Sequence, residues 1–197
     1  MSPLSRLLRR PPEPNGRTLV TRHLVLRPID EADLPAIASL AGDWEVASMT
    51  SRIPYPYTLD DARHWIEGLD DGEFVRAVTH EGVLLGLTGY LPSLDRRSAE
   101  IGYWIGKPYW GRGIATEAAA ALVSHAFGHE RFQRLHCCHF TDNPASQRVI
   151  EKLGFSPVGA CSCWCEARRR EAPALRYALE RPRRGILERV RNAEQPR

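Results

Sequence analysis

The sequence predicts a mixed α/β (α+β) domain, with a largely antiparallel sheet of six to seven strands and helices on both faces. Short runs rich in apolar and β-branched residues indicate the strands, and longer segments with apolar residues on one side indicate the helices. Three strand candidates follow one another at 74–79, 83–91 and 99–105 without an intervening helix, which favours antiparallel pairing. A chain of 197 residues is most simply one domain.

The elements follow from periodicity and from helix-end residues. Asn143 is a good N-cap, Pro144 suits a first helical position, and Gly154 is placed to end the same helix in a left-handed conformation. Strands are expected at 19–26, 74–79, 83–91, 99–105, 134–140, 155–165 and 174–179. Helices are expected at 31–40, 59–69, 114–129 and 144–153.

The composition, 43% hydrophobic and 26% charged, is that of an ordinary globular domain. Of the net charge of +3, residues 1–17 carry +3 and residues 181–197 carry +4, which leaves −4 on the rest. We therefore expect a mildly acidic domain at 18–180, suited to a cationic amine, between two basic tails. Solvated tails are favoured over tails that bind nucleic acid. No apolar run reaches membrane-spanning length, so we expect a cytoplasmic protein without a membrane partner.

The segment 99–119 reads as an apolar strand, a glycine-bearing turn and the first turn of a helix. A helix start preceded by glycines presents free backbone N–H groups and the positive end of the helix dipole, which together attract phosphate. A P-loop is excluded because Ile114 follows the glycines, and a dinucleotide fingerprint is disfavoured because Thr116 occupies the third glycine position. The turn therefore predicts a phosphate-bearing ligand at Gly111, Arg112, Gly113, Ala115 and Thr116.

Residues 110–115, Trp-Gly-Arg-Gly-Ile-Ala, resemble the Gln/Arg-x-x-Gly-x-Gly/Ala signature of the GNAT superfamily of N-acyltransferases, although Trp110 replaces its first residue. The flanking sequence resembles the RimJ/RimL-like branch. Residues 142–146, Asp-Asn-Pro-Ala-Ser, with Leu-Gly-Phe at 153–155, resemble the second hallmark of the family. The likeness covers residues 18–180.

The resemblance implies a GNAT fold and an acetyl-CoA-dependent N-acetyltransferase. Direct transfer, without a covalent enzyme intermediate, is expected because no cysteine has an evident activating partner in the sequence. The expected acceptor is a primary amine, either a protein N-terminal α-amine, such as a ribosomal one, or a small-molecule amine. Acetyl-CoA is the expected co-substrate. The oligomeric state is expected to be either a monomer or a homodimer. The residues expected to hold the cofactor are Tyr103, Trp104, Ile105, Gly111, Arg112, Gly113, Ile114, Ala115, Thr116, Asn143 and Ser146.

Two residues are expected to carry the chemistry. Glu100 leads toward the glycine turn, and its carboxylate suits a general base; the alternative is a surface or salt-bridging glutamate. Ser146 matches the family position that hydrogen-bonds the leaving sulfur; the alternative is a helix residue that satisfies a local backbone group. No tyrosine lies between Asn143 and Phe155, so the acid role that a family tyrosine often fills falls to Ser146 or bound water.

Five cysteines raise the question of a metal site. Cys161, Cys163 and Cys165 alternate and would share one strand face, whereas the run at 136–139, His-Cys-Cys-His, would divide between two faces. Neither run has the Cys-x-x-Cys spacing of common zinc sites. We therefore expect reduced thiols and no metal.

Two other function classes compete with the acetyltransferase. A non-catalytic acyl-CoA-binding sensor would bind coenzyme A tightly, turn over no amine and tolerate substitution of Glu100 and Ser146. A nicotinamide oxidoreductase would bind NADH in place of coenzyme A. The aromatic and proline-rich segment 55–65 is expected either to wall the acceptor site or to pack as a core loop.

Overall fold

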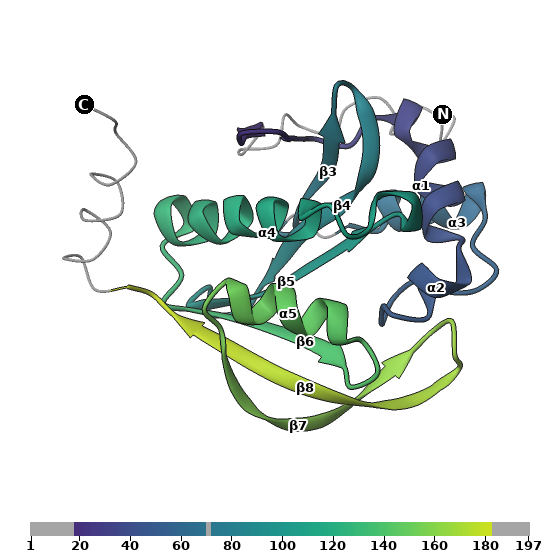
Figure 1. The fold of residues 1–197 in the computed structure, drawn as a ribbon. Helices are drawn as coiled ribbons and strands as arrows, with labels where there is room; N and C mark the ends of the chain where they lie inside the picture. Colours follow the sequence, from purple (N-terminus) through teal and green to yellow (C-terminus); the bar gives the residue numbers. More distant parts are fainter. Residues whose placement is uncertain (1–17, 70–71, 183–197) are drawn as a thin grey trace, which may run out of the picture.

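The computed structural model describes residues 18–69 and 72–182, and a single eight-stranded sheet forms its centre (Figure 1). The strands lie in the order β1-β2-β3-β4-β5-β6-β8-β7. All neighbours pair antiparallel except β5 and β6, which are parallel. The predicted mixed, largely antiparallel sheet is therefore confirmed. The strands are β1 Leu19–Val20, β2 Val25–Arg27, β3 Phe74–His80, β4 Val83–Pro92, β5 Ser98–Ile105, β6 Arg134–Phe140, β7 Ser156–Cys165 and β8 Arg170–Glu180.

The single strand predicted at 19–26 is wrong, because β1 and β2 form a short hairpin at this place. The Thr21 amide donates to the Leu24 carbonyl at 2.9 Å, and the Leu24 amide donates to the Thr21 hydroxyl at 2.9 Å. A threonine side chain that closes a local turn competes with a continuous strand. This hairpin is the reason that the sheet has eight strands where six to seven were predicted.

The helices agree with prediction in position and differ at their ends. The predicted helix 31–40 begins as a 3₁₀ turn, because the side chains of Asp30 and Asp33 form a capping box there. The predicted helix 114–129 is α-helical only to His125 and continues as a π-helical turn. The elements α2 and η3 were not predicted. The helices are η2 Glu31–Asp33, α1 Leu34–Ala41, α2 Trp44–Ala47, α3 Leu59–Glu67, η3 Lys107–Tyr109, α4 Ile114–His125, η4 Ala126–Glu130 and α5 Pro144–Lys152.

Helices cover both faces of the sheet, as expected (Figure 1). On one face, Leu122 of α4 and Ile150 of α5 pack with Ile101 of β5 in a shared apolar core. On the other face, Ile37 of α1 packs with Leu87 of β4, together with Ala62 of α3 and partly buried Trp104 of β5. Because side chains alternate along a strand, Glu100, Gly102 and Trp104 face α1 and α3, whereas Ile101 and Tyr103 face α4 and α5.

The sheet splits between its two parallel strands. Strands β5 and β6 pair only at Ser98↔Arg134, Ala99↔Leu135 and Glu100↔His136, and then diverge. Beyond Glu100, β5 stays paired with β4 as far as Ile105, so its other edge has no strand partner within the described ranges. Since backbone N–H and C=O groups need partners, this edge and the opening beside it are ready to receive a ligand.

The domain boundaries stay a prediction. The basic tails expected at 1–17 and 181–197 lie outside the described residues, except for Arg181 and Pro182. In the part of the chain that the structure describes, no helix has both the length and the apolar character needed to cross a bilayer.

Candidate active site

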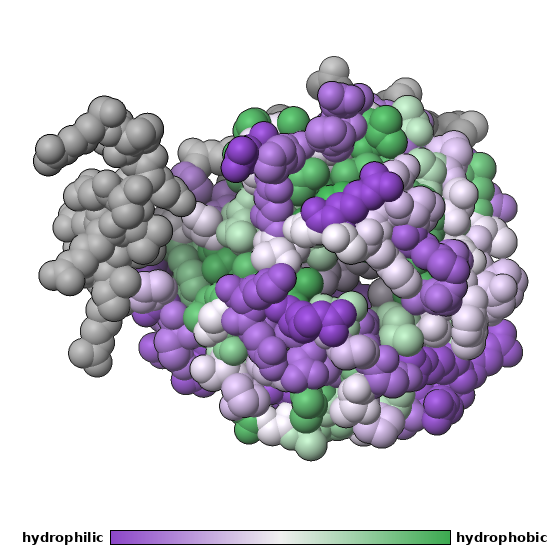
Figure 2. All heavy atoms as spheres, viewed as in Figure 1, coloured by the Kyte–Doolittle hydropathy of each residue, from purple (hydrophilic) through white to green (hydrophobic). Residues whose placement is uncertain are grey.

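A cavity of about 1140 Å³ occupies the opening in the sheet. Figure 2 shows a hollow rimmed by hydrophilic side chains on the face where α4 and α5 lie. The volume exceeds the roughly 300–1,000 Å³ common for small-molecule sites, so it can take two ligands side by side. The structure brings all the predicted site residues to this wall: Glu100, Tyr103, Trp104, Ile105, Gly111, Arg112, Gly113, Ile114, Ala115, Thr116, Asn143 and Ser146.

The glycine turn forms one end of the cavity. Gly111 and Gly113 have φ of 75° and 78°, a region that favours glycine, and a β-carbon at either position would meet open space. The glycines are therefore required by backbone conformation and not by close neighbours. Helix α4 begins at Ile114 with Gly113 as its N-cap, and no side chain caps this end. Its first N–H groups thus point at the cavity together with the positive end of the helix dipole.

Trp110, the residue that departs from the family signature, holds the glycine turn against the end of β5. Its indole Nε1 donates to the Ile105 carbonyl at 2.6 Å. On the same turn, the Arg112 guanidinium lies 6.0 Å from the centre of the Tyr109 ring. Sequence reasoning gave Trp110 no role, and its aromatic neighbours at 103, 104 and 109 gave no signal for this contact.

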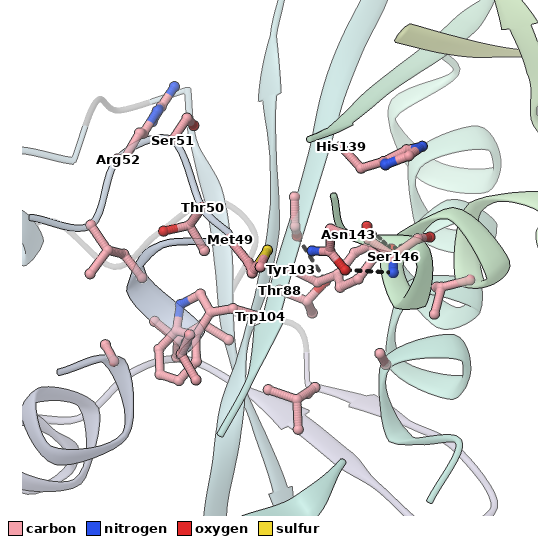
Figure 3. A pocket seen from close by; sticks show the side chains of 18 of the residues that line it. Met49, Thr50, Ser51, Arg52, Thr88, Tyr103, Trp104, His139, Asn143 and Ser146 are labelled. Atoms are coloured by element: carbon pink, nitrogen blue, oxygen red, sulfur yellow. Dashed lines mark hydrogen bonds between the residues drawn. The ribbon is translucent and has the colours of Figure 1, made fainter. Parts of the chain in front are cut away.

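The amino end of α5 forms the facing wall (Figure 3). The Asn143 side-chain oxygen accepts from the Ser146 amide at 3.0 Å, and Pro144 occupies the first turn, so the predicted cap is confirmed. At the other end of α5, Gly154 has φ of 83°, as predicted for a left-handed helix stop. Local chemistry therefore determines both ends of this helix.

Tyr103 reaches from β5 to α5, a contact that was not predicted from the sequence, where Tyr103 was expected only to help hold the cofactor. The Tyr103 hydroxyl lies 2.9 Å from Ser146 Oγ, where either group can donate, and it donates to the Ser146 carbonyl at 3.3 Å (Figure 3). Burial raises the pKa of Tyr103 to about 12, so the phenol keeps its proton at neutral pH. A tyrosine hydroxyl therefore lies beside Ser146 although none exists within the second motif.

Glu100 differs from the other carboxylates on the cavity wall. Glu45 pairs with Lys107, Glu73 with Arg52 and Asp142 with Arg168, and Asp61 caps α3 through Thr58. Glu100 is exposed, and within the described residues its side-chain carboxylate has no hydrogen bond or ion pair. A salt-bridging glutamate therefore finds no partner in this part of the chain, whereas the alternative of a surface glutamate fits the exposure of Glu100.

The wall across from Asn143 and Ser146 comes from the loop after α2. Met49, Thr50, Ser51 and Arg52 line the cavity there, and in Figure 3 they lie on the opposite side of the view from Asn143 and Ser146. From the segment 55–65, the cavity is lined by Tyr57, Asp61, His64 and Trp65. This part of the cavity wall is therefore partly aromatic.

The histidines and cysteines of β6 divide between the two faces as alternation requires. His139 lines the cavity but is buried, with Nδ1 2.7 Å from the Phe140 carbonyl and Nε2 3.3 Å from the Tyr177 hydroxyl. Cys137 is buried on the α4 and α5 face, and burial followed by the charge of Glu100 raises its pKa to about 12. Cys138 lies on the opposite face beside two cysteines of β7.

The profile of the acetyltransferase (GNAT) domain matches residues 23–156, more than half of the chain. The uncharacterized N-acetyltransferase YoaA of Bacillus subtilis (strain 168) is 32% identical over 151 residues, which span 72% of this chain and 84% of that protein.

Two solved structures have the same fold. Ribosomal alpha-N-protein acetyltransferase RimL in complex with coenzyme A superposes with a TM-score of 0.73 at 19% identity, over 83% of this chain and 98% of that one. Spermidine N-acetyltransferase from Vibrio cholerae, in complex with coenzyme A and spermine, has a TM-score of 0.71 at 20% identity, over 82% and 97%. The chain belongs to the GNAT acetyltransferase family.

Proposed function

We propose that this acetyltransferase moves the acetyl group of acetyl-CoA directly onto a primary amine, with both substrates in the cavity between β5 and β6. The observation that carries the proposal is the continuity of this cavity, whose wall runs from the uncapped end of α4 to the unpaired carboxylate of Glu100. Holding both substrates together lowers the barrier by several kcal/mol through orientation alone.

The glycine turn is proposed to bind the diphosphate of the cofactor. The amides of residues 111–116 surround the start of α4, where free N–H groups and the helix dipole favour an anion. The pantetheine arm then lies along the open edge of β5, where Tyr103 and Trp104 offer backbone groups, and near the amide of Asn143. Arg112 adds a cation to the same end of the cavity.

The leaving thiolate is proposed to receive its proton from Ser146. The Ser146 hydroxyl donates toward sulfur, and the Tyr103 hydroxyl, 2.9 Å from Ser146 Oγ, donates to it in turn. With its pKa at about 12, the Tyr103 phenol carries its proton at neutral pH and can act as the hydrogen-bond donor to Ser146. Burial raises the pKa of Cys137 and of Cys138 as well, which disfavours a thiolate nucleophile and supports direct transfer.

Glu100 is proposed as the general base. It lies on the α1 and α3 side of β5, whereas Ser146 reaches the cavity from the α5 side, so amine and thioester approach from opposite faces of the sheet. We expect Glu100→Gln to lower kcat by about 100-fold, because the amine loses its proton acceptor. The loss of kcat in Glu100→Gln should grow as pH falls, because a larger share of the amine is protonated and needs a base to remove its proton. A matched control is Glu171→Gln, at an exposed position of β8. Equal rates for wild type and Glu100→Gln would remove this base from the mechanism.

The acceptor is proposed to be a protein N-terminal α-amine, with a small polyamine as the second candidate. An α-amine, with a pKa of about 7.7–8.0, is neutral far more often at pH 7 than a lysine amine at about 10.4. RimL is named as an alpha-N-protein acetyltransferase, which supports the first candidate, and the spermidine N-acetyltransferase of Vibrio cholerae supports the second.

One assay separates these possibilities. Acetyl-CoA is incubated with the enzyme and either peptides with free N-termini, the same peptides with blocked N-termini, or spermidine, and the released thiol of coenzyme A is measured. Thiol release with free but not blocked peptides supports the α-amine, and release with spermidine supports the polyamine. Coenzyme A binding without thiol release would favour a non-catalytic sensor over an enzyme. Absence of coenzyme A binding would contradict the proposed cofactor site.

A further inference from the structure

Three cysteine side chains from two strands converge on the α1 face of the sheet. Cys138 Sγ lies 3.7 Å from Cys161 Sγ and 3.6 Å from Cys163 Sγ, and all three sulfurs lie within 4.8 Å of one another. Strand β8 runs between β6 and β7, so the sulfurs meet above it. They can do so because β8 presents the small side chains of Ala172 and Ala174 on this face.

The separation of the sulfurs suits a shared metal ion. An ion that holds thiolates at about 2.3 Å with tetrahedral angles keeps their sulfurs about 3.8 Å apart. A disulfide, by contrast, needs an S–S distance of about 2.05 Å and leaves the third sulfur unused. We propose that Cys138, Cys161 and Cys163 form a binding site for a thiophilic d¹⁰ cation, in the first instance Zn²⁺.

The chemistry of the donor set supports a soft cation. Three thiolates select Zn²⁺ or Cu(I) over Mg²⁺ and Ca²⁺, which prefer oxygen. Burial raises the pKa of Cys138 and of Cys163, which favours the protonated thiols of these two residues until an ion binds. Binding is therefore written as Zn²⁺ plus three thiols giving a zinc tris-thiolate with one negative charge and three released protons.

The cluster lies beside the large cavity, so an ion bound by the three cysteines would be accessible from it. All three cysteines are half-buried, and Cys138 and Cys163 also line the large cavity, whereas Cys161 does not. A ligand in the cavity, whose wall also includes Glu100, would therefore reach an ion held by Cys138 and Cys163. The bound ion would also join β6 to β7 across β8 and brace the outer edge of the sheet.

The test measures metal content of the reduced full-length chain. After dialysis against buffered Zn²⁺, we expect one equivalent of zinc per chain by mass spectrometry, three protons released per ion in weakly buffered solution, and a higher melting temperature. Cd²⁺ should give a thiolate-to-metal charge-transfer absorbance. Cys161→Ala should abolish stoichiometric zinc without altering the cavity wall, and Cys138→Ala and Cys163→Ala should do the same.

Matched controls are Cys137→Ala and Cys165→Ala, which remove the two cysteines outside the cluster and should keep the full equivalent of zinc. Circular dichroism and coenzyme A binding confirm that each variant is folded. The proposal is overturned if wild type retains no zinc, if zinc persists in Cys138→Ala, Cys161→Ala and Cys163→Ala, or if binding releases no protons. The proposal also fails if Zn²⁺ does not lower the number of titratable thiols in the reduced protein, and only an oxidant does.

Discussion

The amino ends of α4 and α5 face the same cavity and are built in opposite ways. At α4, the N-cap is Gly113 in a left-handed conformation, and no side chain satisfies the first N–H groups. At α5, Asn143 caps the Ser146 amide and Pro144 removes one N–H from the first turn. The open end retains its hydrogen-bond donors for an external anion, whereas the closed end holds its first turn rigid and presents the Ser146 hydroxyl.

The difference shows that a helix amino end can serve two purposes within one site: it can bind an anion, or it can hold a side chain in position. If the proposed function holds, changes at the α4 end should act mainly on the affinity for coenzyme A. Changes at the α5 end should act mainly on turnover and on stability. Variants of Ser146 and Asn143 test the α5 end, and a variant of Gly113 tests the α4 end.

The largest expected effect is at the closed end. Ser146→Ala should lower kcat by about 100-fold, equivalent to about 2.7 kcal/mol, because the leaving thiolate loses its proton donor. The Kd of coenzyme A should change by less than about threefold. The matched control is Gln147→Ala, the next residue of α5, which does not line the cavity. A fall in affinity equal to the fall in kcat would show that both ends bind the cofactor.

At the open end, Gly113→Ala should weaken coenzyme A binding by about tenfold in calorimetry, because an L-residue opposes the left-handed cap by roughly 1–2 kcal/mol. Pantetheine, which lacks the diphosphate, should bind both proteins equally. Gly82→Ala is the control, since Gly82 has φ of 81° with open space around it and lies outside the cavity. The control should lose similar stability and no affinity. Unchanged coenzyme A affinity in Gly113→Ala would contradict the diphosphate site.

The cap at α5 should be visible in stability. Asn143→Ala removes the acceptor for the Ser146 amide, so the free energy of unfolding in urea should fall by about 1 kcal/mol. Asn143→Ser retains an acceptor and should recover most of the loss. If both variants unfold at the same urea concentration as wild type, the helix does not depend on this cap.

The smallest effect is expected at alkaline pH. Burial favours the neutral phenol of Tyr103 and raises its pKa from 10.0 to about 12, so this stabilisation is complete below pH 10 and is lost as pH rises through about 12. Tyr103→Phe should therefore flatten the fall of melting temperature across this window. Tyr55→Phe, at an exposed ring, is the control. An unaltered alkaline slope in Tyr103→Phe would place the titrating group elsewhere.

Sequence predicted the features of the site that depend on neighbouring residues. The cap at Asn143, the left-handed stop at Gly154 and the turn at Gly111 and Gly113 follow from local backbone chemistry, and the structure has each of them. The strand 19–26 failed because the hydrogen bonds of Thr21 outweighed the apolar pattern around it.

Features that depend on tertiary packing were not predictable from pattern. Tyr103 and Ser146 are 43 residues apart and meet only because α5 packs beside the split in the sheet. The three thiols meet because β8 inserts between β6 and β7, a strand order that residue spacing does not reveal. Within the described residues, the Glu100 carboxylate likewise lacks an ion pair, whereas Arg52 and Lys107 pair with other acidic residues of the cavity wall, which the sequence does not reveal.

The three-rung pairing of β5 with β6 has a consequence for how this scaffold can diversify. Since the gap is created by two main chains that separate, its existence does not depend on the identity of any wall side chain. Substitutions along the loop at 49–57 can therefore reshape the entrance for a different amine while the groove itself persists.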